Sequence, residues 1–354
     1  MKKLIIILSI ISLILPINTY ALSTTSSIIV KDMNSNRVFY NKNEKDVRLI
    51  ASTTKIMTAI LAIENGNLED IVKVDENILQ MYGSNIYIEV GENILLLDLI
   101  YGLMLRSGND AAVTIAKHIG KTEEGFVKLM NKKAQELGMK NTTFSNPTGL
   151  DDDTKNYSTA EDLAILYSYA YKNKTFREVV KTKRYVTTSN TKTYDWYNRN
   201  KILSLYEKAT GGKTGYTPDA KRVLVTSASN NDLSLVAASF NSIYDYDLHI
   251  KLYEEIFNKY KNYLILDKDN FVYQNNLKNK KLYIKNSFSY PLTEEEYNNL
   301  KIDLTIDKEK KSNKVGTVSV YLENNLIKKE NIYEKTTKKK TIWKKISAFF
   351  KNIL

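Results

Sequence analysis

The pattern that most limits the fold is a pair of strand signals at the two ends of a helix-rich segment. Residues 27–32 and 37–40 flank an Asn-Ser-Asn turn and predict a hairpin. Residues 223–226 and 233–238 flank an Asn-Asn-Asp turn and predict a second hairpin. Strands at both ends with helices between them favour an α+β domain with an antiparallel sheet. Apolar residues at helical spacing predict the helices, over residues 52–63, 95–105, 110–119, 122–137 and 159–171, the last with Ser158 as its N-cap.

The pattern changes after about residue 260, where only short strands are predicted. Strict alternation of Leu300, Ile302, Leu304 and Ile306 predicts a strand with one buried face. We therefore expect a first domain over residues 22–259 and a small all-β domain over 260–332. The strands expected in the second domain cover residues 263–266, 282–284, 300–306 and 315–322.

The amino-terminal residues 1–21 predict a secretory signal peptide. Lys2 and Lys3 precede an apolar run of the length of a signal-peptide core, and Ala21 closes a cleavage pattern. The run is shorter than the ~20 residues needed to span a bilayer. The alternative is an uncleaved membrane anchor. Export makes nucleic acid a poor partner, so the net charge of +12 indicates an acidic membrane or polymer instead.

The carboxyl-terminal residues 333–354 predict an amphipathic helix. Its apolar residues, including Trp343 and Phe350, fall within an arc of roughly 140° on a helical wheel. Lys344 and Lys351 lie on the opposite side. A basic face opposite an aromatic-rich face is typical of a helix lying on an anionic membrane surface. The alternative is a terminal helix packed on the protein's own core.

Composition excludes several kinds of chemistry. The chain has no cysteine, which excludes a disulfide scaffold, a cysteine nucleophile and thiolate metal sites. The two histidines, His118 and His249, are far apart in sequence, which excludes a His-x-x-x-His metal helix and leaves a histidine-based triad poorly supplied. Any activated serine in this chain is therefore expected to use another base.

Three short motifs carry the chemistry. Ser52 and Lys55 are three residues apart at the start of a predicted helix, about 4.5 Å along its axis, so the amine can reach the hydroxyl. A lysine acts as a base only if its pKa falls from ~10.4 toward neutrality, which burial on an apolar helix and a second cation would cause. Taken alone, two residues at this spacing are more often an N-cap serine and a surface lysine.

The second and third motifs lie where a cleft is expected. Ser107 and Asn109 fall in a break between two helices, although they could form a simple turn. Lys213-Thr214-Gly215 leads into the second hairpin, where Lys213 could offer an ammonium to a substrate carboxylate and Gly215 allows close approach of a ligand backbone. The alternative is an edge-strand lysine that discourages aggregation.

Together these motifs resemble those of the D-alanyl-D-alanine carboxypeptidases, the low-molecular-mass penicillin-binding proteins of serine peptidase family S11. Ser-x-x-Lys with a Ser/Asn motif and Lys-Thr-Gly is the motif set of penicillin-binding proteins and class A β-lactamases. Family-like runs also occur at residues 50–59, 146–150, 157–160 and 212–217. The resemblance implies a penicillin-binding, β-lactamase-like transpeptidase fold for residues 22–259. It also implies an exported protein held at the outer face of the cytoplasmic membrane by its terminal helix.

The resemblance implies a role for each site residue. Ser52 resembles the acylated nucleophile, Lys55 its general base, and Ser107 with Asn109 the second catalytic motif. The backbone N–H groups of Ser52 and Tyr216 would form the oxyanion hole. The expected substrate is a peptidoglycan stem peptide ending in D-Ala-D-Ala, with β-lactams as covalent inhibitors and no metal or organic cofactor. The residues that hold the terminal carboxylate in this resemblance are Lys213, Thr214, Thr217 and Arg199. With Gly215 and Tyr216 they make up the expected substrate-binding residues.

Two alternatives and three departures remain at this point. A class A-like β-lactamase would share the motifs but would not need the second domain or the membrane helix. A non-catalytic penicillin-binding scaffold or sensor would have no reason to keep all the motif residues. Lys221 and Arg222 stand where a glycine and a bulky apolar residue are expected, and Asn156 where histidine is frequent. These departures concern substrate contacts rather than the reaction.

Overall fold

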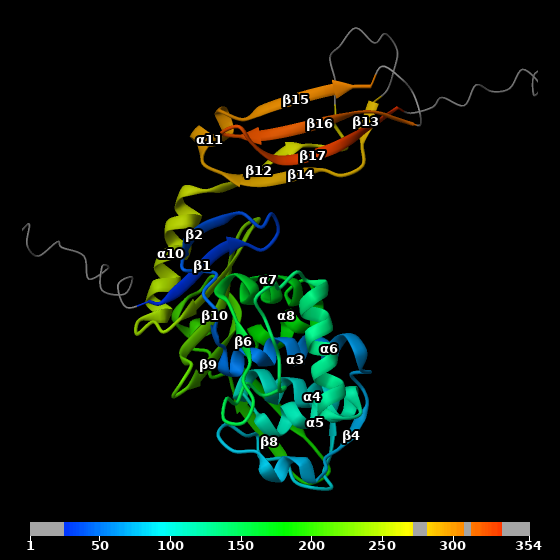
Figure 1. The fold of residues 1–354 in the computed structure, drawn as a ribbon, viewed down its shortest axis with the longest axis vertical. Coiled ribbons are helices and arrows are strands. Elements are labelled where there is room, and N and C mark those ends of the chain that lie inside the picture. The colour runs from blue at the N-terminus through cyan, green and yellow to red at the C-terminus, as the bar shows by residue number, and fades with distance from the viewer. Residues whose placement is uncertain (1–24, 272–281, 308–312, 335–354) are drawn as a thin grey trace, which may run out of the picture. The chain divides into compact units, whose positions relative to one another are not determined.

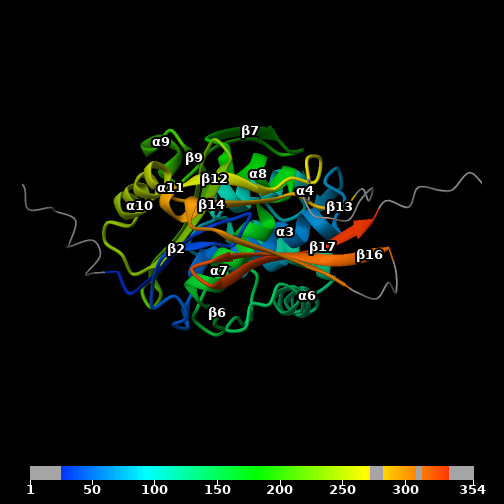
Figure 2. The ribbon, with the colours of Figure 1, turned by 90° about the horizontal axis from the view of Figure 1, so that it is seen from above.

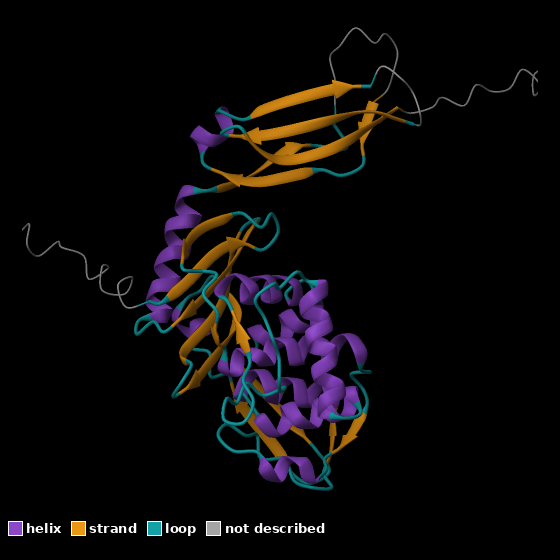
Figure 3. Cartoon of the chain, in the orientation of Figure 1, coloured by secondary structure: helices purple, strands orange, loops and turns teal. Residues whose placement is uncertain are grey.

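The computed structural model describes residues 25–271, 282–307 and 313–334. The chain separates after Asn258 into two compact units, and each unit has its own apolar core. The first unit combines an antiparallel sheet with helices, and the second is formed mainly by strands (Figure 3). The predicted α+β fold followed by a small all-β region is confirmed.

The first unit is built on a five-stranded antiparallel sheet with the order β2-β1-β11-β10-β9 (Figure 1). Both predicted hairpins are present, and the sheet joins them where β1 pairs with β11, with Ile29 opposite Ala238. Strand β9 lies at one edge. The strands are β1 (Ser27–Asp32), β2 (Val38–Lys42), β9 (Ala209–Thr217), β10 (Lys221–Asn230) and β11 (Leu233–Phe240).

Helices cover both faces of this sheet. The hydroxyl of Tyr167 in α7 (Ala160–Ala170) lies 2.9 Å from Ser227 Oγ, whereas His249 in α10 (Asp245–Lys259) places Nδ1 2.8 Å from Thr226 Oγ1. Adjacent residues of a strand point to opposite faces, so α7 and α10 lie on opposite sides of the sheet. Figures 1 and 2 show the same arrangement, with α3 (Lys55–Asn65) on the side of α7.

Helix α3 is the centre of the helical layer, because all of its residues from Lys55 to Ala62 are buried. The other helices of the first unit are α4 (Leu96–Tyr101), α5 (Asn109–Gly120), α6 (Glu123–Glu136), α8 (Lys174–Lys181) and α9 (Ile202–Leu205). Its short helical turns are η1 (Ala51–Thr54), η2 (Glu76–Gln80) and η3 (Gly102–Arg106). Its two-stranded ladders are β3 (Arg48–Leu49) with β6 (Tyr157–Ser158), β4 (Ile71–Lys73) with β5 (Asn93–Leu95), and β7 (Arg184–Thr188) with β8 (Thr193–Tyr197).

Three predicted helix boundaries are wrong. The helix expected from Ser52 begins as the tight turn η1 and becomes α-helical only at Lys55, because Ala51 has a φ of 45°. The helix expected over 95–105 ends in the wider π-helical turn η3. The N-cap of α7 is Thr159 rather than Ser158, since its Oγ1 accepts the N–H of Asp162 at 3.0 Å.

The second unit contains a four-stranded sheet, in the order β13-β17-β16-β15, and the two-stranded ladder β12-β14. Sequence periodicity missed β14, β17 and the short helix α11 (Glu294–Asn298). The strands are β12 (Lys261–Leu266), β13 (Leu282–Ile284), β14 (Phe288–Leu292), β15 (Lys301–Ile306), β16 (Lys314–Leu322) and β17 (Asn325–Glu334).

The prediction of a buried face on β15 is also wrong. Ile302 is 44% exposed and Leu304 is 37% exposed, although their cross-strand partners Val320 and Val318 are fully buried. Strand β15 lies at the edge of its sheet, where fewer side chains pack over Ile302 and Leu304.

The two predicted terminal segments cannot be compared with the structure. Residues 1–21 and residues 335–354 lie outside the described part of the chain. Residues 333 and 334 belong to β17, so the carboxyl-terminal helix does not begin at residue 333 as expected. Over residues 25–271, 282–307 and 313–334, no helix has the length and apolar character needed to cross a membrane.

Candidate active site

Ser52 lies in the tight turn η1, where the chain passes from β3 into α3. Ala51 adopts a left-handed conformation, which is uncommon for a residue with a side chain and is typical of functional sites. Gly149 packs directly against this turn. Its φ is +83°, and a Cβ there would meet the carbonyl oxygen of Ala51 at 1.9 Å. Only glycine therefore allows the 146–150 loop to pack this close to the turn that carries Ser52.

Lys55 lies one turn after Ser52 and is fully buried. Its Nζ is 3.1 Å from Ser52 Oγ, 2.7 Å from Asn109 Oδ1 and 2.5 Å from the carbonyl oxygen of Thr148. Burial lowers the pKa of Lys55 well below its usual value, and the nearby charge of Lys213 lowers it further. These are the two causes expected from the sequence.

The second motif, Ser107 and Asn109, lies where the π-helical turn η3 gives way to helix α5. The π-helical turn η3 ends at Ser107, which has a φ of 67°, and Asn109 begins α5. The buried side chain of Asn109 accepts from Lys55 through Oδ1 and donates to the carbonyl of Tyr82 at 2.6 Å through Nδ2. Asn109 therefore joins the lysine to the loop between η2 and β5.

Lys213 approaches the site from β9. Its Nζ donates to Ser107 Oγ at 3.0 Å and to the carbonyl of Thr214 at 2.8 Å. Burial, with a smaller contribution from the charge of Arg199, lowers the pKa of Lys213 to about 7. The residue was expected to hold a carboxylate, but it is 2% exposed and lies behind Ser107 rather than at the wall of the cavity. It can therefore exchange a proton with Ser107.

A cavity of about 450 Å³ opens in front of these residues. Of the predicted site residues, Ser52, Ser107, Arg199, Thr214, Gly215 and Tyr216 line it. Thr217, which was also expected to bind substrate, is not among the residues that line this cavity. Its hydroxyl donates to Asp151 Oδ2 at 2.6 Å and accepts the N–H of Ala220 at 2.9 Å, so it is engaged in the β9–β10 turn.

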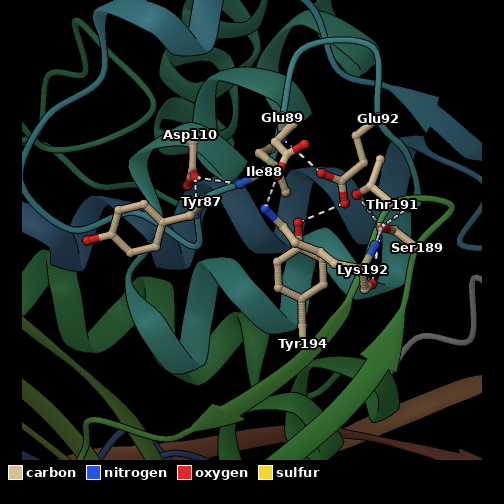
Figure 4. A network of polar contacts seen from close by, with 9 residues as sticks. All are labelled: Tyr87, Ile88, Glu89, Glu92, Asp110, Ser189, Thr191, Lys192 and Tyr194. Atoms are coloured by element: carbon tan, nitrogen blue, oxygen red, sulfur yellow. Dashed lines mark hydrogen bonds and ion pairs between the residues drawn. The ribbon is translucent and has the colours of Figure 1, made fainter.

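The wall of the cavity opposite β9 is a loop held by Asp110. The backbone N–H groups of Ile86, Tyr87 and Ile88 all donate to this buried carboxylate, with Tyr87 at 2.7 Å. Figure 4 shows Asp110 with Tyr87 and Ile88. The same loop carries Ser84, whose Oγ accepts from Arg199 at 2.6 Å. Asp110 therefore fixes the segment that orients a cavity arginine.

A second buried acid continues this network. Glu92 accepts the N–H of Glu89 at 2.8 Å and the hydroxyl of Tyr194 at 2.7 Å (Figure 4). Lys192 donates to Glu89 at 2.6 Å from the β7–β8 hairpin. The loop is thus attached both to α5 and to the hairpin.

Sequence reasoning missed several cavity residues and the carbonyl of Thr148. The carbonyl has no signature in the sequence, although Thr148 lies in the family-like run 146–150. Arg222 was noted as a departure, and its place in the cavity explains why that departure matters. The missed cavity residues are Ser84, Lys201, Arg222, Val223, Asp245 and Tyr246.

Comparison with known proteins agrees with the site. A family model described as "D-alanyl-D-alanine carboxypeptidase" matches residues 18–243, and one described as "Penicillin-binding protein 5, C-terminal domain" matches residues 260–340. The D-alanyl-D-alanine carboxypeptidase DacF of Bacillus subtilis is 38% identical over 222 residues, covering 61% of this chain and 57% of that protein. The chain thus spans little more than half of that relative.

Two further matches extend the comparison. The D-alanyl-D-alanine carboxypeptidase of Streptomyces sp. strain K15 is 38% identical over 215 residues, covering 56% of this chain and 74% of that protein. The solved structure of penicillin binding protein 5 from Haemophilus influenzae superimposes with a TM-score of 0.75 at 25% identity, covering 88% of this chain and 96% of that chain. With more than half of its residues matched by the family model and the three motifs assembled at one cavity, this chain belongs to the D-alanyl-D-alanine carboxypeptidase family.

Proposed function

We propose that this protein is a serine-type D-Ala-D-Ala carboxypeptidase that removes the terminal D-alanine from peptidoglycan stem pentapeptides. The observation that carries the proposal is the environment of Lys55. A neutral amine has two N–H donors and one lone pair, and two carbonyl oxygens, of Asn109 and Thr148, lie within hydrogen-bond distance of Nζ. The lone pair is then left for the hydroxyl proton of Ser52, 3.1 Å away.

Acylation follows from this geometry. Ser52 Oγ attacks the carbonyl carbon between the two D-alanines while its proton passes to Lys55 Nζ. A Cβ on Gly215 would lie 3.1 Å from the backbone nitrogen of Ser52, so β9 runs close beside that N–H group. This closeness supports an oxyanion hole formed by the N–H groups of Ser52 and Tyr216.

Departure of D-alanine requires a proton on its amine. Lys213 and Ser107, 3.0 Å apart, form a donor chain that ends at the cavity wall. A lysine with a pKa of about 7 is partly protonated at neutral pH and can supply that proton through the Ser107 hydroxyl. Lys55 then releases the proton that it took from Ser52 and Lys213 takes one up by exchange with solvent, so both amines return to their starting states. Lys55 can then accept a proton from the water that hydrolyses the Ser52 ester and return it to Ser52 Oγ, which regenerates the enzyme. A β-lactam ring would acylate the same serine.

The terminal carboxylate of the substrate needs a cation at the cavity. We assign this role to Arg199, assisted by the Thr214 hydroxyl, because both line the cavity and Arg199 is held in place by Ser84. Gly215 leaves room for the peptide backbone, and Lys213 contributes to the positive potential from behind Ser107.

The proposed location is the cell-wall space. In this proposal residues 1–21 direct export, residues 22–259 carry the activity, and the terminal helix within 333–354 binds the anionic outer face of the cytoplasmic membrane. Deleting residues 338–354 is expected to abolish binding to anionic vesicles while hydrolysis of a soluble peptide continues. Retained vesicle binding would contradict the membrane role of this segment.

Release of free D-alanine from a stem pentapeptide tests the activity. We expect release by the wild type and none by Ser52→Ala. A class A-like β-lactamase would instead hydrolyse penicillin with fast turnover and leave the pentapeptide intact. A scaffold or sensor would release no D-alanine, and that result would overturn the proposal.

A further inference from the structure

The cavity extends beyond the residues that the proposed reaction uses. Besides the residues named for the reaction, its lining includes Lys201, Arg222, Asp245 and Tyr246. None of these residues has a role in the acyl transfer described above. Three of the four are charged, so these residues are suited to face a polar group.

Arg222 is fixed in place by Asp245. Its Nε and one terminal nitrogen donate to the two carboxylate oxygens of Asp245, each at 3.0 Å, and the Asp245 side chain is only 6% exposed. Such a two-point contact holds the guanidinium in one orientation. The Arg222 side chain remains 49% exposed, so it can still donate hydrogen bonds to a ligand.

The backbone of Lys201 is held by Tyr246, the residue that follows Asp245 in α10. The backbone N–H of Lys201 donates to the hydroxyl of Tyr246 at 3.2 Å. Within the described residues, no contact is found for its ammonium group, and the side chain is exposed. The first two residues of α10 thus each anchor one cationic residue at this end of the cavity.

The charged side chains that line the cavity carry a net positive charge. The described lining has three cations, Arg199, Lys201 and Arg222, and one acid, Asp245, which is paired with Arg222. Arg199 contacts the neutral hydroxyl of Ser84. The terminal carboxylate of a D-Ala-D-Ala peptide compensates one of the two remaining charges and leaves the other without a counterion.

We infer that Lys201 and Arg222 form a leaving-group subsite that binds a second carboxylate, carried by the side chain of the residue that is cleaved off. The inference rests on the proposed function, since it needs Ser52 to cleave the same bond. It extends the substrate class from D-alanine to leaving D-amino acids with an acidic side chain. The released product is then the acidic D-amino acid, and the chemistry at Ser52 is unchanged.

Two peptide substrates of nearly equal size distinguish the effect of the leaving residue's charge from that of its shape. Nα,Nε-diacetyl-L-Lys-D-Ala-D-Glu and its D-Gln counterpart differ only in the side-chain carboxylate of the leaving residue. We expect the wild type to have a kcat/KM for the D-Glu peptide roughly five to ten times that for the D-Gln peptide, as for a charge-assisted contact in a partly shielded cleft. The preference should weaken at high salt.

Single variants then assign the preference to the subsite. Lys201→Met and Arg222→Met should each bring the D-Glu to D-Gln ratio close to one. Lys201 is exposed, so its variant tests the subsite even if loss of Arg222 leaves Asp245 unpaired and destabilises the fold. Lys208→Met is the matched control, because Lys208 pairs with Glu254 and does not line the cavity. It should keep the wild-type ratio.

The outcomes distinguish this inference from the proposed function. Release of D-alanine from the D-Ala-D-Ala peptide with equal rates for the D-Glu and D-Gln peptides would overturn the subsite alone. A preference that persists in both variants would do the same. Failure to release any leaving group would instead overturn the proposed function.

Discussion

Lys55 Nζ lies 3.1 Å from Ser52 Oγ inside a site that excludes water from the lysine. Burial favours the neutral amine, and the carbonyls of Asn109 and Thr148 orient it. A histidine is therefore not needed to activate this serine. In the proposed mechanism the lysine is both a base and a structural group, and substitutions can separate these two roles.

Replacing Lys55 by arginine removes the base and puts a permanent positive charge in its place. A guanidinium is not deprotonated in proteins, so Lys55→Arg is expected to lower the acylation rate about a thousandfold. Acylation by a fluorescent penicillin measures this directly. Lys117→Arg, at a half-exposed lysine on α5, is the control and should acylate at the wild-type rate. Near-normal acylation by Lys55→Arg would rule out the lysine base.

Two substitutions should move the pH dependence of acylation in opposite directions. Asp110 raises the pKa of Lys55 and Arg199 lowers it. Asp110→Asn should therefore shift the acid limb of the acylation profile to lower pH, and Arg199→Gln should shift it to higher pH. Profiles measured on both variants with the same penicillin check the signs. Shifts in the same direction would contradict this electrostatic account.

Removing the buried amine of Lys213 should stabilise the fold. Its folded pKa of about 7 is below the usual 10.5, so the unfolded chain binds more protons between these values and stability falls as pH drops through this range. Lys213→Met should raise the free energy of unfolding at pH 7 by about 1–3 kcal/mol and lower activity. Urea unfolding at pH 7 and pH 9.5 should show a smaller gain at the higher pH.

The control for that substitution is Lys208→Met, which removes a partly exposed lysine paired with Glu254 and should lower stability by at most about 1 kcal/mol. If Lys213→Met lost stability at pH 7, or gained more at pH 9.5, burial of the amine would not be the cause.

Alanine substitutions at Gly149 and Gly138 distinguish the cost of steric crowding from the cost of backbone strain. Both have positive φ, but a Cβ on Gly138 meets open space, whereas on Gly149 it would overlap the Ala51 carbonyl. Gly138→Ala should cost about 1 kcal/mol of unfolding free energy, and Gly149→Ala clearly more. Only Gly149→Ala should also slow acylation, because Thr148 and Ala51 adjoin Lys55 and Ser52. Equal effects of the two variants would contradict the support proposed for η1.

Local patterns made the motifs and hairpins predictable. The spacing of Ser52 and Lys55 predicts their contact without tertiary information, and the turn residues predict both hairpins of the central sheet. The contact of Lys213 with Ser107, across 106 positions of sequence, was not predicted by any local pattern. Lys213 was expected near Lys55 and Ser52.

The site residues and the strand burial that local patterns did not predict depend on long-range packing. The Thr148 carbonyl is a backbone group, and Ser84, Asp245 and Tyr246 reach the cavity only because the loop and α10 pack where they do. The alternation in β15 correctly predicted a strand but not its burial, because nothing in its own residues shows that it lies at a sheet edge.

The site of covalent labelling tests the central claim most directly. Intact-mass and peptide mass spectrometry after incubation with penicillin should show one acyl adduct, located on Ser52, in the wild type. Ser52→Ala should carry none, while Ser107→Ala should still be labelled, more slowly. An adduct that persists in Ser52→Ala, or that maps to another residue, would contradict Ser52 as the nucleophile and with it the role given to Lys55.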